Sequence, residues 1–248
     1  MTEYQRLKNE LPAGTPPLKI VRRKNQRSIR IRIDDEQLLL SAPTAVSSSR
    51  IADFVKEKAG WIHKICEKRK QRNAQLSRLR ESVRGTLLLR GERKPVYSFP
   101  VRSLRKPLLV EHDHAVIYQY EAAPNEPEPV TPDCTTVLDF YRKLAKTELP
   151  QAFDSQVSRL PFQPARLSIR NQKTKWGSCS SRGTISLNWR LVKCPTDIRD
   201  YIIIHELCHL KHFNHSRSFW NTVRKYYPDV DGAKSWIRTN SDIIFSDI

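Results

Sequence analysis

The stretch YIIIHELCH, residues 201–209, predicts a buried helix that carries two histidines, and a third histidine, His215, follows six positions later. Residues four apart on a helix lie on one face and one turn apart, so His205 and His209 can bind a single zinc ion. Glu206 stands beside the first ligand, where a carboxylate can act as general base toward a metal-bound water. Structural zinc sites are closed by four protein ligands and are commonly rich in cysteine, so this pattern favours a hydrolytic site over a structural one.

Two histidines compete for the place of third ligand. His212 continues the helical face, but seven residues of helix rise about 10 Å, too far for three ligands to share one ion. His215 is within reach if the helix ends and the chain folds back. Asn214 supports such a break, because asparagine tolerates left-handed geometry and is favoured after helix ends. We therefore expect His205, His209 and His215 as ligands, with the fourth position open.

The composition indicates a soluble protein. The chain has 248 residues, enough for one large domain or two small ones. Its first residues lack the apolar core of a secretory signal, and no stretch approaches the ~20 apolar residues of a membrane span. The five cysteines form no C-x-x-C pair, which favours reduced thiols. We expect a cytoplasmic protein without membrane contact.

Positive charge is concentrated in the N-terminal part of the chain. Residues 1–110 contain 26 Lys and Arg against 10 Asp and Glu, whereas residues 111–248 contain 18 against 16. A basic region can attract nucleic acid, an anionic membrane or acidic substrates, or it can be a solvated surface. The expected nucleic-acid contacts are Arg30 and Arg32 on the wet face of a strand, and the run 68–72 at the end of a helix.

The sequence pattern divides the chain into four parts. Residues 1–16 form a polar tail, and residues 17–120 a basic region of strands and one helix. Within this region, residues 28–33 alternate apolar and basic side chains, which is typical of a strand with one buried face, and a helix is expected over about 50–72. Residues 121–133, rich in proline and glutamate, form a loop and the best internal boundary.

Residues 134–248 are expected to form the catalytic core. A helix begins after residue 134, and Pro150 starts or kinks the next one. Strands over 166–169 and 184–189 flank a turn-rich connection, and the metal-binding helix follows. The fold class is therefore α+β, with helices packed on a small antiparallel sheet as in zincins. By analogy with that fold, an edge strand near Ile185–Leu187 could bind an extended peptide by strand addition.

Two long stretches carry a family resemblance: IRNQKTKWGSCSSRGTISLNWRLV at 169–192 and DYIIIHELCHLKHFNHSRSFW at 200–220. Together they resemble the YgjP-like metal-dependent hydrolases, relatives of the SprT-like zinc proteases. The similarity is dense from about 135 to 240, extends to 17–72, and is looser between. It implies one zinc per chain bound by His205, His209 and His215, with Glu206 as catalytic base. The family is described as metallopeptidases, and some relatives are linked to nucleotide pyrophosphate hydrolysis.

Residues around W-G-S-C are further candidates for the site. Arg170, Lys173 and Lys175 could steady an oxyanion or bind a phosphate chain, or could be a solvated strand face. Trp176 and Gly177 predict a tight turn, either beneath the site or in the cleft wall. The remaining candidates are Ser178 as an oxyanion donor, Cys179 as a fourth zinc ligand, and Asn188 as a residue that orients a ligand histidine.

Three functions remain open at this point. The first is a zinc metallopeptidase acting on proteins or peptides. The second is a metal-dependent nucleoside triphosphate pyrophosphatase, which would use the same water and the basic residues as phosphate ligands. The third is a nucleic-acid-associated protein with a vestigial metal site, which the intact Glu206 disfavours.

Overall fold

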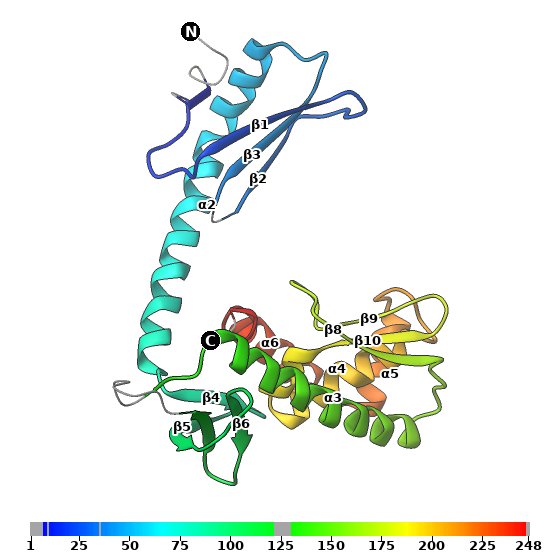
Figure 1. Ribbon diagram of the computed structural model, residues 1–248. Helices are drawn as coiled ribbons and strands as arrows, with labels where there is room; N and C mark the ends of the chain where they lie inside the picture. The colour runs from blue at the N-terminus through cyan, green and yellow to red at the C-terminus, as the bar shows by residue number, and fades with distance from the viewer. Residues whose placement is uncertain (1–6, 9, 35, 122–129, 247–248) are drawn as a thin grey trace. The chain divides into compact units, whose positions relative to one another are not determined.

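The computed structural model describes residues 7–8, 10–34, 36–121 and 130–246, and the chain divides into two compact units, residues 1–82 and 83–248 (Figure 1). Both units combine helices with small sheets, which confirms the predicted α+β class. The sheets are mixed, with parallel and antiparallel pairs, so the prediction of an antiparallel sheet was wrong. Two predicted features lie partly outside the described residues: the tail 1–16 and the loop 121–133.

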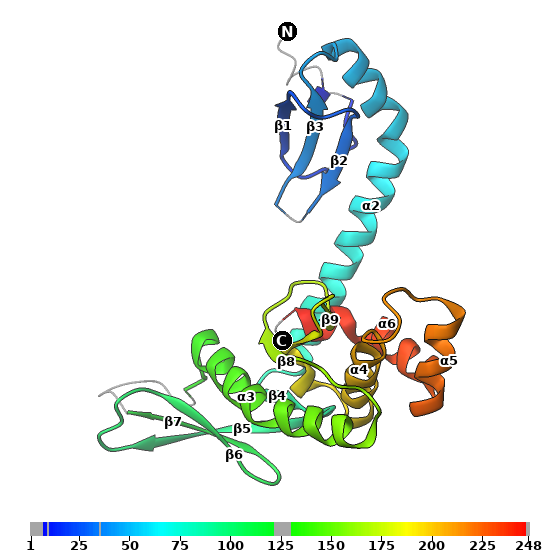
Figure 2. The ribbon, with the colours of Figure 1, turned by 90° about the vertical axis from the view of Figure 1, so that its right-hand side faces the viewer.

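The first unit is a three-stranded sheet with a long helix against one face (Figure 2). Its elements are β1 (Leu18–Arg23), β2 (Arg30–Ile33), β3 (Leu38–Pro43) and α2 (Ser48–Ser82). The central strand β3 runs parallel to β1 and antiparallel to β2. Apolar side chains from the sheet and α2 form the core, which also includes Leu7, only 1 % exposed. The expected polar tail therefore contributes to this core.

The alternation in β2 has the predicted result. Arg30 and Arg32 are exposed, while Ile31 and Ile33 pack against the core. In the sheet register, Arg32 and Lys19 flank Leu39 from the two neighbouring strands. The face of the sheet that points away from the core is therefore basic.

Helix α2 is longer than predicted, because it ends at Ser82 and not near residue 72. Its start is capped by Ser47, whose hydroxyl accepts a hydrogen bond from the N–H of Arg50 at 3.2 Å. Residues 73–82 contain several strong helix formers and neither glycine nor proline, so nothing stops the helix at residue 72. The basic run 68–72 therefore lies inside the helix, and its predicted position at the end of the helix was wrong.

The second unit holds two sheets, of order β4-β5-β7-β6 and β8-β10-β9, together with the remaining helices. Its elements are β4 (Thr86–Leu89), β5 (Glu92–Val101), β6 (Leu108–Glu111), β7 (Val116–Glu121), α3 (Cys134–Arg159), β8 (Arg166–Arg170), β9 (Gly177–Cys179), β10 (Thr184–Asn188), the 3₁₀ helix η1 (Trp189–Lys193), α4 (Thr196–Cys208), α5 (Arg217–Tyr226) and α6 (Val230–Phe245). Helix α3 contacts β6, β8, η1 and α4, so it joins both sheets to the helix that carries the histidines (Figure 1).

The boundary between the units differs from the predicted one. The strands β4–β7 were assigned to the N-terminal region, but their side chains share one core with α3 and α4, including Leu89, Tyr118, Tyr141 and Ile203. The Tyr141 hydroxyl also donates to the carbonyl of Leu88 at 3.1 Å. A common core is what makes one unit, so the division falls at Ser82 and not at residues 121–133.

Helix α3 is continuous through Pro150, where the sequence favoured a break or a kinked start. Asp133 caps it by accepting hydrogen bonds from the N–H groups of Thr135 and Thr136. Proline removes one backbone donor, but Leu149 and Phe153 on either side are buried in the core and hold the helix together. Among the described helices of the chain, none is long and apolar enough to cross a membrane.

Candidate metal centre and cleft

Helix α4 places two imidazoles on one face. Its apolar residues, among them Ile203 and Leu207, are buried in the core of the second unit. His205 and His209 lie one turn apart on the other side, with ring centroids 4.9 Å apart. Burying one face of the helix therefore fixes the direction of both histidines.

His215 joins them because the helix ends at Cys208 and the chain turns back. Its Nε2 atom lies 3.1 Å from Nε2 of His205. One ligand nitrogen of each of the three rings lies within 4.8 Å of the others. Asn214 does not have the predicted left-handed backbone. Its side chain instead accepts a hydrogen bond from the N–H of Ser216, which shapes the return of the chain.

The hydrogen bonds around the rings fit a metal ion. Nδ1 of His209 lies 2.9 Å from the carbonyl oxygen of His212 and donates to it, which leaves Nε2 as an acceptor. The ring of His212 lies 3.1 Å from the hydroxyl of Thr222 on α5 and is outside the cluster. Nδ1 of His205 is buried without a hydrogen-bond partner among the described residues. The lone pairs that converge here suit a cation.

Burial keeps these rings in the form that binds metal. Desolvation, together with the smaller effects of the neighbouring His209, His215 and Lys234, lowers the pKa of His205 to about 3. Desolvation also lowers the pKa of His215. Since only a neutral imidazole has a free lone pair, both rings are ready to coordinate a metal near neutral pH.

Two aromatic residues of α5 hold the rings in place. The Phe219 ring lies 4.9, 4.4 and 4.9 Å from the ring centroids of His205, His209 and His215. Trp220 stacks on His215 at 5.5 Å. The hydroxyl of Ser216 caps α5 by accepting a hydrogen bond from the N–H of Phe219. The packing thus restricts the orientation of all three imidazoles.

Glu206 lies against a strand where only glycine fits. Its side chain is largely buried, and a Cβ atom added to Gly177 would lie 2.6 Å from its Cγ atom. Burial raises the pKa of Glu206 to about 7, and the charge of Lys175 opposes this shift. Gly177 has no positive φ and makes no tight turn, contrary to the prediction. Its role is to let the carboxylate approach the strand closely.

The edge strand beside the histidines is β9, and the prediction that placed this edge at Ile185–Leu187 was wrong. Those residues belong to β10, which is central between β8 and β9. On the β10 side, Trp176 accepts from Asn188 N–H at 2.8 Å and Ser180 donates to Thr184 O at 2.9 Å. Because the N–H and C=O groups of successive residues point to opposite sides of a strand, those of Gly177 and Cys179 point away from β10. That edge lines the cleft and has no strand partner in the described structure.

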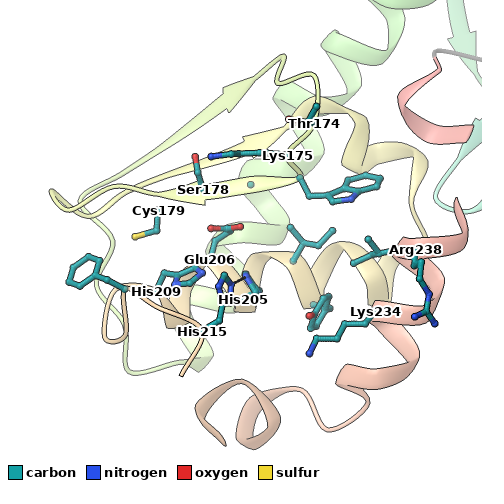
Figure 3. A pocket seen from close by; sticks show the side chains of 16 residues that line it. Thr174, Lys175, Ser178, Cys179, His205, Glu206, His209, His215, Lys234 and Arg238 are labelled. Atoms are coloured by element: carbon teal, nitrogen blue, oxygen red, sulfur yellow. Dashed lines mark hydrogen bonds between the residues drawn. The ribbon is translucent and has the colours of Figure 1, made fainter. Parts of the chain in front are cut away.

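The cleft has a volume of about 560 Å³ and lies between β9, α4 and α6 (Figure 3). It is lined by apolar and cationic side chains together with the histidine cluster and Glu206. Lys175, Trp176 and Ser178 lie in its wall as predicted candidates, whereas Arg170 and Lys173 are outside it. Trp176 is anchored on α6 by an edge contact with Phe245, at 4.7 Å between ring centroids.

Three candidate residues have contacts that change their expected roles. The Ser178 hydroxyl accepts from Gln172 and points away from Glu206, so it is poorly placed as an oxyanion donor (Figure 3). Asn188 donates to the carbonyls of Gln172 and Lys175, both at 2.8 Å, and thus holds the loop before β9 and not a histidine. Cys179 lies outside the ligand cluster, and partial burial and Glu206 raise the pKa of its thiol.

The sequence interpretation missed the contribution of α6 to the cleft. Lys234, Ile237 and Arg238 of α6 line it, together with Tyr201 and Ile202 of α4. The spacing of Lys234 and Arg238, four residues apart, does place both on one helix face. Nothing local in the sequence says that this face lies opposite the metal helix.

Comparison with known proteins identifies the family. The model of the YgjP-like metallopeptidase domain matches residues 27–240, so the chain belongs to this family and is a metal-dependent hydrolase of the metallopeptidase type. No curated protein matches the chain. Among solved structures, the metallopeptidase zymogen of Pyrococcus abyssi abylysin is 30 % identical, covering 42 % of this chain and 92 % of its own, with a TM-score of 0.28.

Proposed function

We propose that this member of the YgjP-like family is a zinc metallopeptidase with one zinc ion per chain, bound by His205, His209 and His215. The observation that carries the proposal is the convergence of three imidazole nitrogens within 4.8 Å beside a buried carboxylate, Glu206. Three protein ligands with a place left for water are typical of catalytic zinc sites in a zincin-like core. The aromatic residues that pack against the imidazole rings restrict their orientation, which also supports the proposal.

The bound metal and the residues of the chain would have separate roles in hydrolysis. A bound zinc ion would polarise the scissile carbonyl and lower the pKa of a water molecule toward neutrality. Glu206 accepts a proton from the attacking water at its carboxylate and donates it to the nitrogen of the leaving amine. Gly177 allows the carboxylate to lie close to β9, where a substrate would also lie.

An extended peptide fits the exposed edge of β9. The backbone groups of Gly177 and Cys179 can bind it by strand addition, which recognises main chain without regard to side-chain identity. The cleft wall is also largely apolar, with Trp176, Ile202 and Ile237 available for side chains. Both features favour a peptide or unfolded protein as substrate.

A second candidate is a nucleoside triphosphate pyrophosphatase. It is favoured by the three cations in the cleft, Lys175, Lys234 and Arg238, which could bind a phosphate chain. The edge of β9 has no evident use in such a reaction, and for that reason we place this candidate second.

Nucleic-acid contact is a separate proposal for the first unit. The basic outer face of its sheet, with Lys19, Arg30 and Arg32, is suited to phosphate contacts. Such a contact would locate the enzyme near nucleic acid without taking part in hydrolysis. A purely nucleic-acid-associated protein with a vestigial metal site leaves the burial of Glu206 beside the histidines unexplained.

The decisive experiment compares zinc-loaded wild type with Glu206→Gln. Both are offered unfolded protein, quenched peptides, UTP and ATP. We expect peptide cleavage by wild type only, with equal zinc content in both proteins, because Glu206 is a base and not a ligand. Release of phosphate or pyrophosphate without peptide cleavage would reverse the order of the two candidates. Equal turnover in Glu206→Gln with zinc retained would refute the mechanism.

A further inference from the structure

One end of the cleft carries positive charge that the hydrolytic mechanism does not use. Among the described residues lining the cleft, Lys175, Lys234 and Arg238 are cationic, and Glu206 is the sole carboxylate. Lys234 and Arg238 both come from α6, one turn apart, and Figure 3 shows them at the end of the cleft away from His209. A substrate that enters here meets an excess of positive charge.

The two α6 cations are available to a ligand. In the described part of the chain, neither Lys234 nor Arg238 has a carboxylate within ion-pair distance. Asp231, three residues before Lys234, pairs with Arg224 on α5 at 3.7 Å. The Lys234 ammonium is positioned by Trp220, whose ring centroid lies 3.3 Å away. Because Trp220 also stacks on His215, the position of this charge relative to the histidine cluster is restricted.

The charged end lies close to the reacting bond. Tyr201 and Ile202 line the cleft one helical turn before His205 and Glu206, which corresponds to about 5.4 Å along α4. An extended peptide advances about 3.3 Å per residue. The first or second residue beyond the scissile bond therefore reaches the cations.

The direction of β9 indicates whether the cations lie on the N-terminal or the C-terminal side of the scissile bond. The strand starts beside α6, where Trp176 contacts Phe245, and runs toward Cys179 at the His209 end (Figure 3). Antiparallel pairing is somewhat more stable than parallel pairing. A peptide paired antiparallel to β9 runs from the His209 end toward α6. Its residues on the C-terminal side of the scissile bond then meet Lys234 and Arg238.

We propose that Lys234 and Arg238 form a subsite for a carboxylate on the C-terminal side of the scissile bond. The inference rests on the proposed peptidase function and adds the substrate class: peptides with an acidic side chain, or a free C-terminal carboxylate, within two residues after the cleaved bond. An ammonium and a guanidinium can both donate charge-assisted hydrogen bonds to such a group.

The test uses matched peptides and matched variants. One quenched peptide is made with Glu, Gln or Lys at the first or second position after the cleaved bond, and each form ends in an acid or an amide. The position series detects a side-chain carboxylate, and the acid–amide pair detects a terminal one. The kcat/KM is measured for wild type and for Lys234→Met combined with Arg238→Met. Lys225→Met is the control, since Lys225 likewise lies over an aromatic ring, that of Tyr226, but outside the cleft.

Wild type and the control variant should prefer the carboxylate form about ten-fold or more, and the double variant should lose the preference while keeping its zinc. The same order should appear in the Kd of labelled peptides for zinc-loaded Glu206→Gln, which binds without cleaving. Cleavage with no preference, or a preference on the N-terminal side only, would overturn the inference and leave the peptidase function standing. Preferential binding without any cleavage would support the subsite and refute the peptidase. Nucleotide hydrolysis that needs Lys234 and Arg238, without any peptide binding, would overturn both.

Discussion

Replacing Gly177 with alanine should lower turnover about 100-fold without loss of zinc or of the fold. The new Cβ atom would lie 2.6 Å from Cγ, 2.7 Å from Oε1 and 2.9 Å from Cδ of Glu206. Since non-bonded carbon atoms settle about 3.5–4.0 Å apart, the Glu206 side chain must retreat by about 1 Å. A displacement of about 1 Å at a reacting group can reduce the rate about 10²-fold, or about 2.7 kcal/mol in the barrier.

The fold should survive because all three nearest atoms belong to the Glu206 side chain, which can move. The backbone of Gly177 is also one that alanine adopts, since its φ is not positive. Elemental analysis would give the zinc content, thermal unfolding the Tm, and a quenched peptide kcat. Gly60→Ala is the control: no atom lies within 4 Å of its new Cβ, so activity should stay unchanged and Tm should rise slightly.

A double variant shows whether the effect passes through Glu206. Adding Gly177→Ala to Glu206→Gln should change the residual rate little, because the displaced carboxylate is already absent as a base. If Gly177→Ala reduces the rate equally in both backgrounds, the alanine acts on something other than Glu206, and the argument from close approach is wrong.

Three further outcomes are expected. Elemental analysis should find no zinc in His205→Ala, His209→Ala or His215→Ala. It should find zinc in His212→Ala, because His212 contributes only its backbone carbonyl, which accepts from His209. Loss of zinc in His212→Ala with retention in His215→Ala would exclude the proposed ligand set. Cys179→Pro should lower kcat/KM for peptides more than Cys179→Ala, because only proline removes the donor on the outer edge of β9; equal effects would argue against strand addition. Charge reversal of Arg30 and Arg32 should weaken salt-sensitive binding of DNA or RNA in anisotropy titrations without changing zinc content, and no binding by wild type at ~50 mM salt would leave the charge a solvated surface.

Local patterns predicted the parts of the fold that depend on neighbours in sequence. The alternation around Ile31 and the start of α2 were predicted correctly, because strand faces and helix caps are set by a few adjacent residues. The end of α2 and the continuity of α3 through Pro150 were not. In both cases the surrounding helix formers or the core decide where a helix stops, and a local signal for a break carries less weight.

Pairing between distant segments could not be predicted from the sequence. The strand at 184–188 has the apolar pattern of a buried strand, but nothing in it says whether it is central or at an edge. The short strand β9 was assigned to a turn, since it holds only Gly177, Ser178 and Cys179. For the same reason the sequence did not predict that α6 lines the cleft. Lys234 and Arg238 read only as cations on one helix face, because it is the packing of Trp176 on Phe245 that brings this helix alongside β9.

The two stretches that mark the family, 169–192 and 200–220, depend on each other to form the site. The first supplies Gly177, which admits the Glu206 carboxylate, and Asn188, which holds the loop leading into β9. The second supplies Glu206 itself, the three histidines, and the aromatic residues of α5 that orient them. A helix with the H-E-x-x-H pattern alone lacks the strand against which its glutamate is packed. The pair of stretches is therefore more specific for a working site than either one, since each contains what the other requires.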